Sequence, residues 1–290
     1  MREKPVFKKI IDFEEAKEII EQMRHDRGYP SGYRDLDKLC GGLVKDGVTL
    51  IAARPAMGKT SLALNIVSRL SVEQGCTILI FSPQMWSDEI TIRLLSIAMN
   101  LEPENFLNNK VSPATIAAKF LDYYEAKESS IKIDLDSFVS LDDIWDRCCR
   151  IPDLRLVVID PANAICKPIN FSAGSAKWDE KEDPAVVFQS LQKLAQSLNV
   201  PILCPVHLHR SLEKRKNKRP HLGDLKKIGL SADMVDQIIF LYRDRYYYPE
   251  GQERAELIVA KVAQGDVGTV RLDWDYATRR FTEKEMMHES

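Results

Sequence analysis

The sequence predicts an α/β fold in which a mostly parallel central sheet is flanked by helices. Short apolar runs rich in β-branched residues recur along the chain and alternate with stretches of helical periodicity. Several of these runs are apolar throughout, as buried parallel strands are. The chain has 290 residues, 44% of them hydrophobic, which is enough for one large domain with a sizeable core. The expected strands occupy residues 48–53, 77–82, 131–135, 154–160, 201–206, 237–241, 256–262 and 268–274.

A tight loop joins the first expected strand to a helix and has the composition of a phosphate-binding loop. Free backbone N–H groups and the positive end of the helix would face an anion there. Lys59 would reach the β- and γ-phosphates of ATP, and the Thr60 hydroxyl would bind Mg²⁺. Ala53 stands where the general pattern has its first glycine, and a plain strand-to-helix turn is the alternative. The expected ATP-binding residues are Arg54, Pro55, Ala56, Met57, Gly58, Lys59, Thr60 and Ser61.

Two polar residues end other expected strands. Asp160 closes the apolar run at 154–159, at the carboxyl end of a strand, where doubly wound sheets place ligand chemistry. We expect Asp160 to hold Mg²⁺ together with Thr60; the alternative is an aspartate that only starts a turn before Pro161. His207 ends the strand at 201–206 and is either a polar strand end or a sensor of the nucleotide state.

Composition and charge argue against several classes of protein. The net charge of −2 argues against a wholly basic nucleic-acid binder, although it permits a local basic patch. No apolar run approaches the ~18 residues of a membrane helix, and the N-terminus lacks a signal-peptide pattern. The six cysteines show no C-x-x-C spacing, so neither zinc nor disulfides are indicated. We therefore expect a cytoplasmic protein without a membrane partner.

The chain is expected to divide into an N-terminal arm, residues 1–30, and one large domain, residues 31–290. A capping box at Asp12 and Glu15 predicts a helix in the arm, with one apolar stripe. The stripe could pack on the same domain or on a neighbouring subunit, and its residues are Ala16, Ile19, Ile20 and Met23.

Residues 210–227 form a basic segment that follows a central strand. Eight of its side chains are lysine or arginine, against the two acids Glu213 and Asp224. A charge run of this kind is often only a solvated loop. Its position after a central strand and the glycine that follows it favour binding to phosphates of single-stranded DNA. The expected DNA-binding residues are Arg210, Lys226, Lys227 and Gly229.

From Pro30 to Phe281, the chain resembles the motor domain of bacterial and phage replicative helicases of the DnaB type. The resemblance implies a RecA-like P-loop ATPase core and a homo-oligomeric ring, a hexamer, with ATP at subunit interfaces. It also implies that single-stranded DNA passes through the ring and that the arm is a linker helix docked on the next subunit. The matching stretches are residues 31–37, 53–60, 159–160, 210–213, 218–220, 224–227, 232–233, 242–244 and 268–272. Recombination-type RecA relatives share only the phosphate loop and the pattern at 32–37.

Three positions depart from that family at the hydrolysis machinery. Gln84 stands where the family has a glutamate that activates the attacking water, and an amide cannot accept the proton. In the family an arginine at the position of Ala263 serves as an arginine finger in trans, whereas Lys261 two residues earlier is kept here. His207 replaces a glutamine. The catalytic candidates are therefore Lys59, Gln84, Asp160, His207 and Lys261.

These departures leave two hypotheses open. The chain could be a working motor in which Asp88 or Glu89 has taken over as the base. It could instead be a paralogue that hydrolyses slowly or not at all and serves as an assembly or regulatory partner of a true helicase. We favour ATP and DNA binding with weakened hydrolysis, since three changes accompany an intact binding loop.

Overall fold

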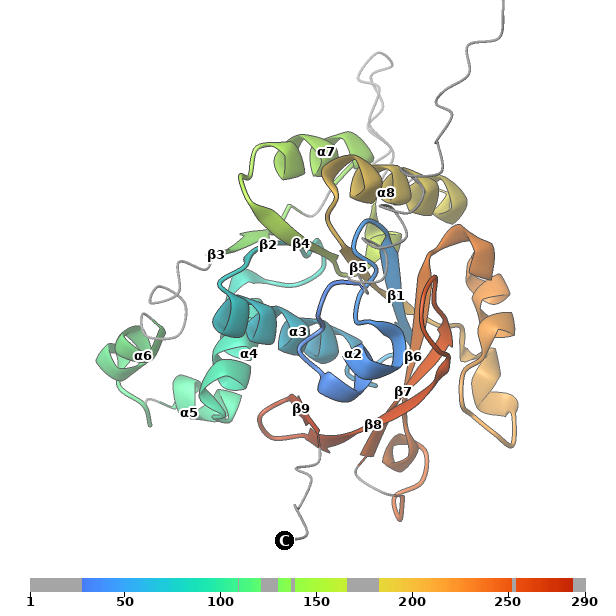
Figure 1. Cartoon of the computed structure of the whole chain (residues 1–290). Coiled ribbons are helices and arrows are strands. Elements are labelled where there is room, and N and C mark those ends of the chain that lie inside the picture. The colour runs from blue at the N-terminus through green and yellow to red at the C-terminus, as the bar shows by residue number, and fades with distance from the viewer. Residues whose placement is uncertain are drawn as a thin grey trace, which may run out of the picture.

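The computed structural model describes residues 28–108, 110–120, 130–136, 139–165, 183–251 and 254–283. The expected arm helix lies outside these ranges. A nine-stranded sheet crosses the molecule in the order β3-β2-β4-β5-β1-β6-β7-β8-β9 (Figure 1). The strands are β1 (Val48–Ala53), β2 (Thr77–Phe81), β3 (Ser130–Asp134), β4 (Leu154–Ile159), β5 (Ile202–His207), β6 (Gln237–Arg243), β7 (Arg254–Lys261), β8 (Gly268–Asp275) and β9 (Arg280–Thr282).

The sheet is mostly parallel, as the sequence predicts. β1 to β6 all pair in parallel, and β7 to β9 extend the sheet with antiparallel pairing. The sequence pattern indicates three closing strands, whereas the structure has a fourth, β9, which is too short to show alternation. β9 is held by its pairing with β8 and by the Phe281 ring, which lies 4.3 Å from the Trp274 ring between centroids.

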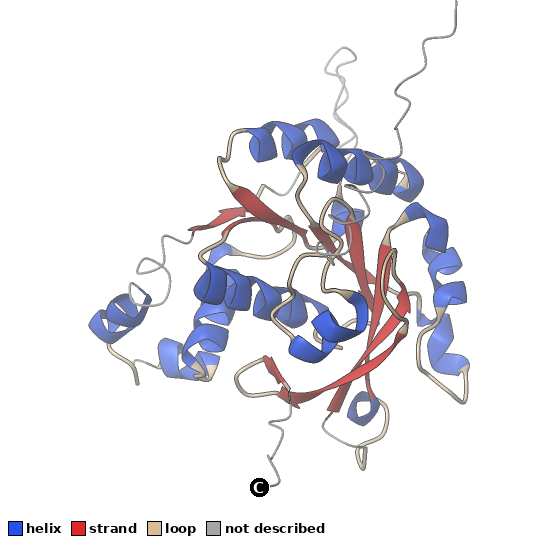
Figure 2. Ribbon diagram, in the orientation of Figure 1, coloured by secondary structure: helices blue, strands red, loops and turns tan. Residues whose placement is uncertain are grey.

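Helices cover both faces of the sheet (Figure 2). α2, α3 and α4 lie on one face, α7 and α8 lie on the other, and α5 and α6 extend beyond the β3 side. Within the described ranges, no helix combines the length and apolarity that crossing a bilayer requires. The helices are α2 (Arg34–Cys40), α3 (Lys59–Gln74), α4 (Ser87–Met99), α5 (Pro103–Leu107), α6 (Pro113–Phe120), α7 (Leu141–Cys149) and α8 (Pro184–Leu198). Short 3₁₀ helices are η2 (Ala162–Ala164), η4 (Arg210–Lys214), η5 (Leu222–Ile228), η6 (Ala232–Met234) and η7 (Asp244–Tyr246).

Alternate side chains of the central strands enter two separate cores. Ile51 and Val158 belong to the core beneath α3, whereas Leu50 and Phe240 belong to the core beneath α8. Burial on both faces explains why these strands read as continuous apolar runs. Because β1, β2, β4 and β5 are parallel, the segments that follow them emerge at one edge of the sheet. That edge brings together residues that lie far apart in the sequence.

Truncating the core beneath α8 should destabilise the protein. Phe240 is 0% exposed, and Phe240→Ala should lower the free energy of unfolding by about 3–5 kcal/mol through lost burial and a residual cavity. Chemical denaturation followed by circular dichroism measures this. Val267→Ala removes apolar atoms from a side chain that is 61% exposed and should change stability by only about 0.5 kcal/mol. A loss below about 1 kcal/mol for Phe240→Ala would contradict this description of the core.

Candidate functional site

The loop after β1 wraps around the first turn of α3, a helix of 16 residues. Gly58 precedes the helix with φ of 100°, and a Cβ atom there would lie 3.1 Å from the Phe281 ring. Backbone strain and lack of space therefore both favour glycine. The Met57 side chain is buried and anchors the loop in the core. The strand–loop–helix arrangement is therefore the predicted one, and the first N–H groups of a helix such as α3 favour an anionic ligand.

Lys59 is the first residue of α3, directly after this loop, and is only 4% exposed. Its Nζ donates a hydrogen bond to the Arg54 carbonyl oxygen at 3.0 Å. Burial lowers the pKa of Lys59 to about 8, an effect that the Asp160 charge opposes and the Arg54 charge reinforces. A buried ammonium whose hydrogen-bond acceptor is a neutral backbone carbonyl is stabilised strongly when an anion becomes a further partner.

Asp160 follows β4 directly and is 8% exposed. Burial raises its pKa above the usual range, whereas a hydrogen bond from the Thr60 hydroxyl and the charges of Lys59 and Arg93 act in the opposite direction. The structure therefore brings Thr60 and Asp160 together. Their oxygen atoms are the ligand type that Mg²⁺ prefers, and Mg²⁺ sites commonly use one or two protein ligands with substrate phosphates. Among the described residues, no group of three His, Cys, Asp or Glu side chains could form a protein-only metal site.

His207 and Gln84 belong to this edge of the sheet, where β5 and β2 end with β4 between them. His207 ends β5 and lies opposite Ala53 in the β1–β5 register. Desolvation and the positive charges of Lys59 and Arg54 lower its pKa to about 4, so the imidazole is neutral at pH 7. Gln84 is exposed in the turn between β2 and α4. A neutral histidine and an amide can exchange hydrogen bonds with a ligand, but the amide cannot accept a proton at pH 7.

The two candidate replacement bases lie in the first turn of α4. The Asp88 Oδ1 atom accepts a hydrogen bond from the Glu89 N–H at 3.0 Å. The Glu89 carboxylate forms an ion pair with Arg93 one turn along the helix. Glu89 is therefore already engaged with a cation.

Lys261 is separated from the other catalytic candidates. It lies opposite Ile238, near the start of β6, whereas the phosphate loop follows the far end of β1. Its Nζ donates to the carbonyl oxygens of Ala232 at 2.7 Å and Val235 at 2.6 Å. Lys261 thus cannot act on a nucleotide in the phosphate loop of its own chain.

The basic segment, residues 210–227, is partly folded and partly neutralised. Arg215 forms an ion pair with Asp224 at 2.9 Å, and Arg219 forms one with Glu256 at 2.7 Å. The Lys218 ammonium lies 5.2 Å from the centroid of the Tyr248 ring. These side chains hold the segment against the rest of the domain. The lysines and arginine expected to bind DNA are exposed, and these are Arg210, Lys226 and Lys227.

Gly229 ends η5 with φ of 76°. Its N–H points back to the carbonyl oxygens of Leu225 and Lys226. The sequence predicts that Gly229 lets backbone amides approach a phosphate. The N–H of Gly229 itself is already hydrogen-bonded within η5. The glycine serves as a helix-ending residue here.

Two arginine contacts could not be found from the sequence pattern. The Arg54 side chain reaches Glu213 in η4, 159 residues away, with Nε 2.8 Å from Oε1. The Arg243 guanidinium lies 4.7 Å from the Trp274 ring centroid, and its Nη1 donates to the Met57 carbonyl oxygen at 3.4 Å. Both arginines therefore tie the phosphate loop to elements that follow it far along the chain.

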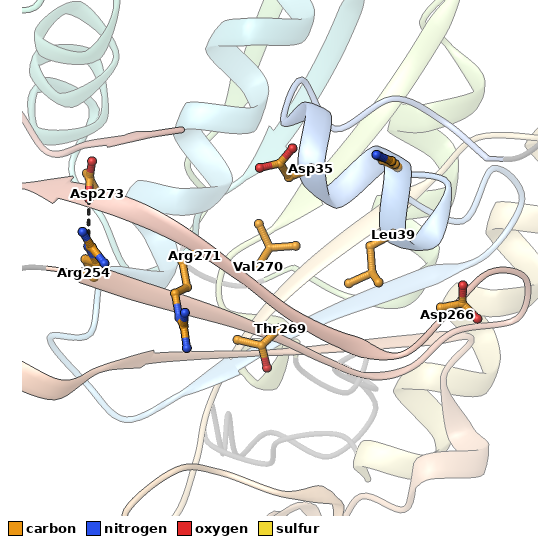
Figure 3. Close-up of a pocket in the computed structure, with 9 residues that line it drawn as sticks. Asp35, Leu39, Arg254, Asp266, Thr269, Val270, Arg271 and Asp273 are labelled. Carbon is orange, nitrogen blue, oxygen red and sulfur yellow. Dashed lines mark ion pairs between the residues drawn. The ribbon is translucent and has the colours of Figure 1, made fainter. Parts of the chain in front are cut away.

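Two cavities lie outside the phosphate loop. The larger, of about 690 Å³, lies between α2 and β8 and is lined by charges of both signs, including Asp35, Arg254 and Arg271 (Figure 3). It contains none of the predicted site residues. The smaller, of about 250 Å³, lies where β4 and β5 end and is mostly apolar, with His207 and Asn163 in its wall.

Comparisons with known proteins identify the family. The family described as DnaB-like helicase C terminal domain matches residues 28–283. The replicative DNA helicase DnaB of Geobacillus stearothermophilus is 29% identical over 94% of this chain and 63% of its own length. The corresponding protein of Buchnera aphidicola subsp. Acyrthosiphon pisum is 31% identical over 88% of this chain and 56% of its own length. The chain thus spans about six-tenths of the length of these relatives.

Solved structures agree with the sequence comparisons. A separately solved ATPase domain superposes with a TM-score of 0.80 at 28% identity, over 94% of this chain and 99% of that one. A DnaB-like replicative helicase, solved in work on its interactions with primase, superposes with a TM-score of 0.78 at 28% identity, over 94% of this chain and 67% of that one. The RadB recombinase superposes with a TM-score of 0.51 at 15% identity, over 88% of this chain and 99% of that one. This likeness shows the RecA-like fold alone. The chain belongs to the family of DnaB-like helicase C-terminal domains.

Proposed function

We propose that this chain is the ATP-binding motor domain of a DnaB-like replicative helicase, with weakened ATP hydrolysis. The observation that carries the proposal is the constellation of Lys59, Thr60 and Asp160 around the start of α3. Lys59 would turn from the Arg54 carbonyl to the β- and γ-phosphates, while the helix terminus holds the same phosphates through N–H groups. Thr60 and Asp160 would hold Mg²⁺, which neutralises phosphate charge when bound.

Assembly is the second part of the proposal. Lys261 and the neighbouring Ala263 lie at the far end of β7 from the phosphate loop of the same chain. They could face a nucleotide only across an interface with another subunit. This supports a homo-oligomeric ring, a hexamer, or a mixed assembly with a true helicase subunit. Single-stranded DNA as a ligand also supports a cytoplasmic location.

Weakened hydrolysis follows from the chemistry of two side chains. Gln84 cannot take a proton from the attacking water, and general-base help is worth about 10²–10⁴-fold. Ala263 cannot stabilise transition-state charge, and an arginine finger is worth roughly 10³–10⁵-fold, although such losses do not add. The Glu89 carboxylate is already held in an ion pair with Arg93, so it is poorly placed to serve as a replacement base.

The same observation supports an alternative function. A chain that binds ATP without turning it over could act as a nucleotide-dependent assembly or regulatory partner within a helicase. Both functions require the phosphate loop, and they differ in the rate of hydrolysis.

Single-stranded DNA is the proposed second ligand. Arg215 and Arg219 are committed to internal ion pairs, whereas Arg210, Lys226 and Lys227 are exposed and available for phosphates. Lys226 and Lys227 lie in the last turn of η5, where Gly229 fixes the chain direction. Their role is charge neutralisation rather than base recognition.

Replacing Lys59 should remove most ATP affinity. Truncating a buried charged contact typically costs about 2–5 kcal/mol, so Lys59→Ala should weaken ATP·Mg²⁺ binding by roughly thirtyfold or more in a calorimetric titration. Because phosphate favours the protonated lysine, affinity of the parent should also fall as the pH rises through about 8, the pKa of Lys59 in the free protein.

Lys59→Arg is the control for this pH dependence. Arginine keeps its charge throughout this range, whereas the ionisation of ATP itself is common to parent and variant. The fall in affinity above pH 8 should therefore be confined to the parent. Unchanged ATP affinity in Lys59→Ala would refute the assignment of the phosphate site.

Removing two lysines from η5 should lower the salt dependence of DNA binding. Log affinity for single-stranded DNA falls with log salt by about 0.7 per phosphate neutralised, so Lys226→Ala with Lys227→Ala should lower the slope by about 1.4. The control pair Lys110→Ala with Lys132→Ala removes equal charge from two exposed positions outside the basic segment, one between α5 and α6 and one in β3. The assignment fails if the η5 pair keeps the parent's affinity and slope, or if the control pair loses as much.

A further inference from the structure

Arg54 contacts the phosphate lysine and the basic segment at the same time. Its carbonyl oxygen accepts the hydrogen bond from Lys59 Nζ at 3.0 Å. Its guanidinium donates from Nη1 to the Leu208 carbonyl oxygen at 2.7 Å and from Nε to Glu213 Oε1 at 2.8 Å. Leu208 and Glu213 belong to the stretch that leaves β5 and enters η4. One residue therefore joins the proposed ATP site to the start of the proposed DNA-binding segment.

The backbone reinforces this connection. The Leu208 N–H donates to the Ala53 carbonyl oxygen at 2.9 Å, so the loop and the segment start side by side. The Arg54 side chain is 17% exposed and that of Glu213 is 36% exposed. A pair this shielded is screened less by salt than a fully exposed ion pair. Leu212, between the two contacts, is buried in the core beneath α8 and holds η4 in place.

Phosphate at the loop would act on both contacts of Arg54. Lys59 would leave the Arg54 carbonyl in order to reach the phosphate. The Arg54 guanidinium would then have two anions to choose from, the nucleotide phosphates and the Glu213 carboxylate, and arginine binds both in the same planar manner. Nucleotide occupancy would therefore change how firmly Arg54 holds Glu213, and with it the position of η4.

We propose that the Arg54–Glu213 ion pair is a positioning element that couples nucleotide occupancy to single-stranded DNA affinity. This inference rests on the proposed function, since it requires that both ligands bind. Glu213 touches neither ligand; it acts through Arg54 and through the placement of η4 and the basic segment that follows. Coupling between two sites is reciprocal, so DNA must change ATP affinity by the same factor.

The experiment measures a coupling factor. Affinity for a fluorescently labelled single-stranded oligonucleotide is determined for the full chain, with and without a saturating non-hydrolysable ATP analogue and Mg²⁺. The factor is the ratio of the two dissociation constants, and couplings of this kind are typically about 5–150-fold. In Glu213→Gln, which removes the charge and keeps the shape, we expect a factor within about twofold of one.

Glu256→Gln is the matched control. It also removes a carboxylate that pairs with an arginine of the basic segment, Arg219, but it has no contact with the phosphate loop. It should shift DNA affinity equally with and without nucleotide and so keep the parent's factor. Arg54→Lys provides a second variant, because lysine cannot bind Glu213 and the Leu208 carbonyl through two fixed nitrogens. Arg54→Lys should lower the factor as Glu213→Gln does, and the double variant should lower it no further.

The measured affinities and coupling factors distinguish failure of the proposed function from failure of this inference. A parent that binds neither ligand would refute the proposed function and this inference with it. A parent that binds both with a factor of one would refute the inference alone. Retention of the parent's factor in Glu213→Gln, or an equal loss in Glu256→Gln, would also overturn it. Should Glu213→Gln fail to fold by circular dichroism, Arg54→Lys decides the question in the same way.

Discussion

Parallel pairing of β1 with β5 is the constraint on which the rest of the structure depends. The register sets Ala53 opposite His207, so the phosphate loop and the basic segment leave the sheet at neighbouring points. β4 lies on the other side of β5 and delivers Asp160 to the same edge. Three segments that are far apart in sequence thereby meet around the start of α3. Helices on both faces make this placement rigid, because every central strand is buried on two sides.

The buried charges of Lys59 and Asp160 stabilise each other at this edge of the sheet. Lys59 and Asp160 are both buried, and burial moves each pKa toward the neutral form. Each charge opposes the shift of the other, and the Thr60 hydroxyl adds a hydrogen bond to the carboxylate. The N–H groups at the start of α3 add further donors beside the Lys59 ammonium. The electrostatics of such a site favour a ligand that brings negative charge together with a divalent cation.

Much of the fold, and the strand–loop–helix element of the candidate site, could be predicted from the sequence, because both rest on local patterns. Continuous apolar runs identified the parallel strands, and the strand–loop–helix pattern identified Lys59 and Thr60. What could not be predicted depends on register and on side-chain reach. The Arg54–Glu213 pair joins residues 159 apart, and the separation of Lys261 from the phosphate loop of its own chain follows from its pairing with β6. The internal ion pairs of Arg215 and Arg219 likewise turn part of an apparent charge patch into structure.

The central claim is that an intact phosphate site is combined with an altered hydrolysis site, and steady-state ATP turnover tests it most directly. Turnover is compared with and without single-stranded DNA for the parent, for Gln84→Glu with Ala263→Arg, and for Gln84→Asn, which keeps an amide. We expect parent and Gln84→Asn to lie well below the ~1–100 s⁻¹ typical of phosphoryl-transfer enzymes such as kinases, and the double replacement to exceed them clearly. A parent that already reaches that range with DNA would contradict the account, because another residue would then serve as the base.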